Sequence, residues 1–144
     1  MSTPHRPCLS LTRVPSTPAT LRLPYAPESA RAARLLVRTK LTEWNVPRLI
    51  DDAELIVSEL VGNAARTGCR AAMMVGIRRA SCDTVRLLVS DGSASLPVLI
   101  DAGLDAESGR GLFLVGLLTQ QRWGVIPWPR GKVVHATLSV STGI

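Results

Sequence analysis

The segment DDAELIVSELVGNAARTG, residues 51–68, combines an apolar helical face with a polar stripe. Apolar side chains recur every three or four residues, which predicts an amphipathic helix that ends near Arg66. We expect Asp51 or Asp52 to cap this helix and Gly68 to follow its end. The expected core face consists of Ala53, Ile56, Val57, Leu60 and Ala64.

The polar stripe consists of Glu59, Asn63 and Arg66, which fall within about 60° of one another on the helix. They lie beside the core face, where a carboxylate is costly unless it is paired or takes part in chemistry. Carboxamide and carboxylate oxygens suit magnesium, which needs few protein ligands. The stripe is therefore a candidate site, and an exposed stripe with weak local pairs is the alternative.

Size and composition narrow the classes of protein to consider. The chain has 144 residues, which favours one domain, and its residues are 46% hydrophobic but only 3% aromatic. The core must therefore be aliphatic. The net charge is +6, yet the sequence has no dense Lys/Arg run and no helix-turn-helix or zinc-finger spacing. A small basic nucleic-acid binder is the least favoured hypothesis.

Cysteine and hydropathy patterns favour a cytoplasmic protein. The three cysteines form no CxxC pair, so we expect reduced thiols rather than a disulfide framework or a zinc site. The sequence contains no run of 18 apolar residues, so it predicts no membrane span. Residues 1–18 are rich in Pro, Ser and Thr, so we expect a disordered tail there and the folded domain over residues 19–144.

The remaining pattern predicts a two-layer α+β sandwich, with a mixed, mainly antiparallel sheet and helices on one face. Alternating or continuous apolar runs predict strands at 20–26, 71–79, 84–91, 121–128 and 132–140. Helical spacing predicts helices at 28–44, 51–66 and 111–120. The last helix is apolar almost all round, so we expect it to be buried.

The predicted helix at 28–44 carries a basic stripe of Arg31, Arg34 and Arg38 beside its core face. The expected core face consists of Ala30, Ala33, Val37, Leu41 and Trp44. Such a basic stripe is usually a solvated face. Its alternative role is a docking surface for an acidic partner.

Two further motifs suggest a nucleotide. In VSDGS, residues 89–93, Asp91 ends a strand, where a carboxylate can accept a hydrogen bond from an exocyclic amine such as that of adenine. The same motif is also a common turn. In ESGRGLFLV, residues 107–115, Gly109 and Gly111 permit close backbone approach, and helix N-terminal amides favour phosphate. A lone GxG is unspecific, and this one does not directly follow a strand as a Rossmann motif does.

The order of these motifs resembles the nucleotide-binding domain, or Bergerat fold, shared by histidine kinases, gyrase-type ATPases and Hsp90. More closely, it resembles the stand-alone bacterial proteins related to anti-sigma factor serine/threonine kinases. The likeness covers about residues 20–140. It is carried by VSELVGNAARTG, VSDGS, SGRGLFLV and the closing RWGV and GKVVHATL.

The resemblance implies that the protein binds ATP and Mg²⁺. By it, Asn63 would hold the metal, Glu59 would act as general base or position the nucleophile, and Asp91 would contact the adenine amine. Residues 94–108 would form a flexible lid, and the glycine motif a loop on the phosphate side. The other implied nucleotide contacts are Arg66, Gly92, Ser93, Gly109, Arg110, Gly111 and Leu112.

The implied function is transfer of the ATP γ-phosphate to an anti-anti-sigma partner by a cytoplasmic kinase that also binds a sigma factor. Relatives often form homodimers. Two departures weaken the case for fast transfer, because Glu107 stands where better-known kinases have arginine and Thr67 where many have histidine. A catalytically weak, ATP-gated protein-binding module therefore remains the alternative.

Overall fold

A computed structural model of the chain describes residues 18–66, 72–91, 106–128 and 131–140. In these residues five strands form one sheet in the order β1-β2-β3-β5-β4. The strands are β1 (Ala19–Leu23), β2 (Met73–Ser81), β3 (Thr84–Asp91), β4 (Trp123–Trp128) and β5 (Gly131–Ser139). Each pairing between these strands is antiparallel, so the expected parallel contribution to the sheet is not observed there.

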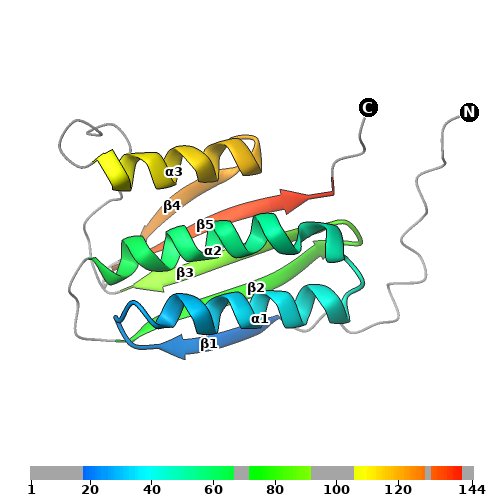
Figure 1. Ribbon diagram of the computed structural model, residues 1–144, viewed down its shortest axis with the longest axis horizontal. Helices are drawn as coiled ribbons and strands as arrows, with labels where there is room; N and C mark the ends of the chain where they lie inside the picture. The colour runs from blue at the N-terminus through cyan, green and yellow to red at the C-terminus, as the bar shows by residue number, and fades with distance from the viewer. Residues whose placement is uncertain (1–17, 67–71, 92–105, 129–130, 141–144) are drawn as a thin grey trace, which may run out of the picture.

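The predicted two-layer α+β sandwich is confirmed. The described residues form three α-helices. These helices cover the same face of the sheet, as Figure 1 shows. They are α1 (Ser29–Glu43), α2 (Ile50–Ala65) and α3 (Ala106–Thr119), and a short 3-10 helix, η2 (Pro47–Leu49), precedes α2. The core lies between the two layers, because alternate strand residues such as Val75, Leu87 and Ala136 are fully buried against the helices.

The core faces predicted for α1 and α2 are confirmed, but the start of α2 is not. The helix begins at Ile50, and Leu49 occupies the N-cap without a side-chain hydrogen bond. Asp51 and Asp52 lie in the first turn instead, where carboxylates interact favourably with the helix dipole. Neither aspartate caps α2 because η2 leads directly into this helix. Gly68, expected to follow the helix, lies outside the described residues.

Helix α3 differs from its prediction in two ways. It begins at Ala106, earlier than the expected residue 111. It is also not buried all round, because Phe113 and Leu117 are 60% and 57% exposed while Leu112 and Val115 are 1% and 0% exposed. An apolar helix at the margin of a two-layer sandwich has only one face covered, and composition alone does not show where the margin falls.

The expectation of reduced thiols is wrong for Cys82, which lies in the turn between β2 and β3 and is disulfide-bonded. The other cysteines of the chain, Cys8 and Cys69, lie outside the described residues. Spacing along the chain could not show which thiols the fold brings within bonding distance.

Among the described helices, none has the length and apolar character that crossing a bilayer requires.

Candidate functional site

The predicted site residues that the structure describes gather at one end of the sandwich. Figure 1 shows the last turn of α2, the end of β3, the first turns of α3 and the start of β5 at this same end. These segments carry Asn63, Asp91, Gly111 and Lys132. Motifs far apart in the sequence are thus brought to one edge of the molecule.

Glu59 and Gly111 are in direct contact between α2 and α3. A Cβ atom built on Gly111 would overlap the Glu59 carboxylate and would lie 2.9 Å from its Cδ atom. The absence of a side chain at residue 111 therefore lets the Glu59 carboxylate lie against α3. The half-buried carboxylate therefore lies at the junction of the two helices.

Asn63 lies one turn further along α2. Its Oδ1 atom accepts a hydrogen bond from the Arg66 guanidinium. Its Nδ2 atom is buried and has no hydrogen-bond partner in the described part of the chain. A buried polar atom without a partner costs about 1–3 kcal/mol. The carboxamide is thus placed for a partner that the described residues do not supply.

Asn63 fits the role of a magnesium ligand in one respect. Rotating its carboxamide by half a turn exchanges oxygen and nitrogen and brings an oxygen to the buried position, at the cost of the Arg66 hydrogen bond. The described residues contain no group of three or more His, Cys, Asp or Glu that could hold a metal. A metal at this end would therefore depend on Asn63, phosphate and water oxygens, which is common for Mg²⁺.

Asp91 is the last residue of β3, and its side chain is 1% exposed. Its Oδ1 atom accepts a hydrogen bond of 3.1 Å from Nζ of Lys132, whose side chain is 4% exposed. Lys132 is its directly paired residue on β5. A carboxylate can accept several hydrogen bonds, so this ion pair is compatible with a further donor such as an adenine amine.

Lys132 has no role in the sequence-based prediction. The sequence feature that could have identified Lys132 is its position as a lone lysine at the start of the apolar strand GKVVHATL. A charged residue in such a run is usually paired when it is buried. The pairing with Asp91 follows only from the strand register.

The glycine motif differs from its prediction. Gly109, Arg110 and Gly111 lie within α3 rather than in a loop that precedes it. In an α-helix, an amide at this depth bonds to the carbonyl four residues earlier, so it does not point at a ligand. Gly92 and Ser93 lie outside the described residues, as do residues 94–105 of the expected lid, while 106–108 are helical.

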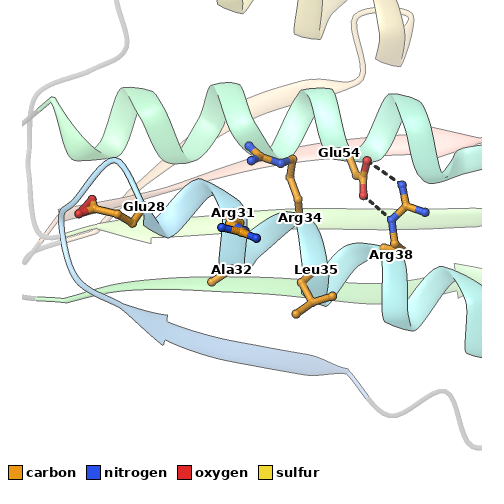
Figure 2. Close-up of a pocket in the computed structure, with 7 residues that line it drawn as sticks. All are labelled: Glu28, Arg31, Ala32, Arg34, Leu35, Arg38 and Glu54. Carbon is orange, nitrogen blue, oxygen red and sulfur yellow. Dashed lines mark hydrogen bonds and ion pairs between the residues drawn. The ribbon is translucent and has the colours of Figure 1, made fainter.

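A second surface lies on the outer side of α1 and α2, where an open groove of about 590 Å³ runs along the basic stripe (Figure 2). Arg38 forms a two-pronged ion pair with Glu54, at 2.8 and 3.2 Å, which raises the pKa of Arg38. Arg34 donates a 3.0 Å hydrogen bond to Oγ of Ser58. The guanidinium of Arg31 makes no hydrogen bond or ion pair to a described residue. The groove is lined by Glu28, Arg31, Ala32, Arg34, Leu35, Arg38 and Glu54.

The stripe therefore has a partly structural role, since two of its three arginines connect α1 to α2. Exposed ion pairs contribute only about 0–1 kcal/mol. Arg31 and Leu35, which is 64% exposed, remain the residues on this face that are open to a partner.

Comparison with known proteins supports the fold. No protein-family model matches the sequence, and no curated protein matches it. The crystal structure of the RsbU and RsbW domains of Rv1364c from Mycobacterium tuberculosis is similar, with a TM-score of 0.67 and 22% sequence identity. The likeness covers 88% of this chain and 33% of that chain, so this chain spans about a third of the length of that neighbour. The antiparallel sheet with helices on one side is consistent with an RsbW-like fold.

Proposed function

We propose that the protein is a cytoplasmic, ATP-binding regulator of the partner-switching kind that resembles anti-sigma factor serine/threonine kinases. In this proposal it transfers the γ-phosphate of ATP to a serine or threonine of an anti-anti-sigma partner and binds a sigma factor as a homodimer. The observation that carries the proposal is the contact of Glu59 with α3, together with the position of the segments that carry Asn63 and Asp91 at the same end of the sandwich (Figure 1). The similarity to a structure that contains an RsbW domain supports it.

Each residue has a proposed task. Asp91 accepts a hydrogen bond from the adenine amine, with Gly92 and Ser93 beside the base. Asn63 holds Mg²⁺, which would neutralise phosphate charge during transfer. Glu59 accepts the proton of the attacking hydroxyl. Arg66 and the segment Gly109–Leu112 contact the phosphates, which requires the first turns of α3 to rearrange when nucleotide binds.

Glu59→Gln tests the kinase proposal. The variant keeps the size of the side chain but removes its ability to act as a base, so we expect labelling of a purified anti-anti-sigma protein from the same genome by γ-³²P-ATP to fall about 10²–10⁴-fold. ATP affinity should change little. Glu54→Gln is the matched control, because Glu54 lies on the same helix and pairs with Arg38 instead.

Equal labelling by wild type and Glu59→Gln would show that Glu59 is not the base. Absence of labelling in all three proteins, with ATP still bound, would favour the alternative function.

The alternative is an ATP-gated protein-binding module with weak catalysis. Two observations favour it: Arg66 already occupies Oδ1 of Asn63, and the glycine motif is helical. In this version, nucleotide binding alters the first turns of α3 and thereby the affinity for a partner that docks at Arg31 and Leu35. This version would be contradicted if the affinity for a partner were the same with and without nucleotide and the same for wild type and Arg31→Gln.

A further inference from the structure

The face of the sheet that the helices leave uncovered has an unusual charge pattern. Figure 1 shows α1, α2 and α3 on the opposite face. On the uncovered face, Arg78 of β2 and Arg86 of β3 are directly opposite one another in the strand register. Their neighbours along the strands, Ile77 and Leu87, are buried on the helix side, so both arginines point away from the helices.

This arrangement costs stability. Like charges directly opposite on neighbouring strands are destabilising. Arg78 is exposed, and its side chain has no hydrogen bond or ion pair to a described residue that would offset the repulsion. Arg86 makes only a long contact of 3.4 Å between its Nε atom and Oγ1 of Thr137. A repulsive pair without an ion partner on its own face suggests that the compensating charge comes from another molecule.

The surrounding residues strengthen the positive charge of this face. Arg22 of β1 is exposed on the same side, because its neighbours Leu21 and Leu23 point to the core. His135 of β5 lies beside Arg86, but it adds no positive charge at neutral pH, because burial and then the charge of Arg86 lower the pKa of His135. In the described strands, the residues that point to this side include no aspartate or glutamate.

Apolar side chains lie among these cations. Leu88 is half-buried, and Met74 and Ile126 are 39% and 53% exposed. Arginine and methionine are enriched in protein interfaces, and guanidinium groups bind carboxylates in a two-pronged geometry. A surface that only bound phosphate backbones would not need the apolar contacts.

We propose that the uncovered face of the sheet is a docking surface for an acidic segment of a protein partner, with Arg78 and Arg86 as its central contacts. The surface lies on the side of the sheet away from α2 and α3, so it does not depend on nucleotide binding.

Two occupants from the chain itself are disfavoured by charge. Residues 1–17 contain Arg6 and Arg13 but no aspartate or glutamate. A second copy that packed face to face would place like-charged arginines against one another. An acidic partner is complementary in charge to this face, whereas residues 1–17 and a second copy of the chain are not.

The test is fluorescence anisotropy of a labelled peptide of alternating glutamate and valine, titrated with the full chain at low salt. Arg78→Gln/Arg86→Gln is compared with a helix-face variant, Lys40→Gln/Arg48→Gln, whose residues lie in α1 and η2. Each double variant removes two positive charges and takes the formal net charge from +6 to +4. We expect the sheet-face variant to bind about tenfold more weakly, because two charge-assisted contacts are lost. The helix-face variant should stay within about twofold of wild type.

Four outcomes would overturn the proposal: no binding of the peptide to the wild type, equal weakening in both double variants, weakening only in the helix-face variant, or tighter binding of a DNA duplex of equal charge.

A second measurement checks whether the opposed arginines reduce the stability of the protein. Arg78→Gln should raise the Tm without peptide, because it relieves the cross-strand repulsion. A lower Tm of Arg78→Gln than of the wild type would show that the two arginines do not destabilise the folded protein, and it would contradict the proposal.

Discussion

At the scale of single residues, the buried ion pair of Asp91 and Lys132 stabilises the site end of the sheet. Both side chains are almost fully buried and their charged atoms are 3.1 Å apart. Removing one partner of such a pair leaves an uncompensated charge in the interior. Asp91 therefore has a structural role in addition to its proposed contact with adenine.

This role predicts that Asp91→Asn lowers the free energy of unfolding by about 3 kcal/mol, measured by urea denaturation. Lys132→Met in the same background should restore part of the loss, because the unpaired ammonium is removed. Additive losses in the double variant would show that the two residues do not interact.

His135 predicts a dependence of stability on pH. Its pKa lies below the usual 6.5 because burial, and then the charge of Arg86, disfavour the protonated imidazole. The folded state thus binds the proton less readily than the unfolded state. Stability contributed by the neutral form is present above about pH 6.5 and is lost as the pH falls through the lower folded-state pKa.

We therefore expect urea midpoints of the wild type to fall between pH 7.5 and pH 5.5, and His135→Gln to show a smaller fall. His5, the other histidine of the chain, is present in both proteins and serves as an internal control. An equal fall in both proteins would contradict this role of His135.

At the scale of elements, the contact between α2 and α3 fixes the direction of Glu59. A methyl group at residue 111 would displace the Glu59 carboxylate, which is the mobile end of a side chain. Gly62, also on α2, offers the matched control, since a Cβ there would meet nothing within 4 Å.

We predict that Gly111→Ala leaves the protein folded, because the gain in helix propensity offsets the displacement of Glu59. It should nevertheless reduce phosphoryl transfer as Glu59→Gln does. Gly62→Ala should raise the free energy of unfolding by about 0.4–1 kcal/mol and keep the activity. Circular dichroism melts and labelling assays measure both. Full activity in Gly111→Ala would mean that the position of Glu59 is not important.

The same elements show which structural features can be predicted from the sequence. Helices α1 and α2 were predicted with their core faces because each has a clear amphipathic period. The start of α3 was missed because Gly109 and Gly111 have low helix propensity. Packing overrides that propensity here, since the helix places Gly111 against Glu59.

At the scale of the whole molecule, the two-layer class followed from the order of helices and hairpins, but the strand order did not. The placement of β5 between β3 and β4 pairs Asp91 with Lys132, which is 41 residues away. The sequence contains no local signal for such a contact. Glu59, Asn63 and Asp91 were identified by their chemistry and by family resemblance, and the fold brings their segments to one end.

The proposed function requires this end of the molecule to bind Mg-ATP. The most direct measurement is titration calorimetry of ATP and ADP, with and without Mg²⁺, for wild type, Asn63→Ala and the control Ser58→Ala on the same helix. Asn63→Ala should stay folded, because alanine is the better helix former and the unpaired buried amide is removed. We predict magnesium-dependent ATP binding to wild type and Ser58→Ala that is lost in Asn63→Ala. Absence of ATP binding to the wild type, or magnesium-dependent binding that Asn63→Ala leaves unchanged, would contradict the claim.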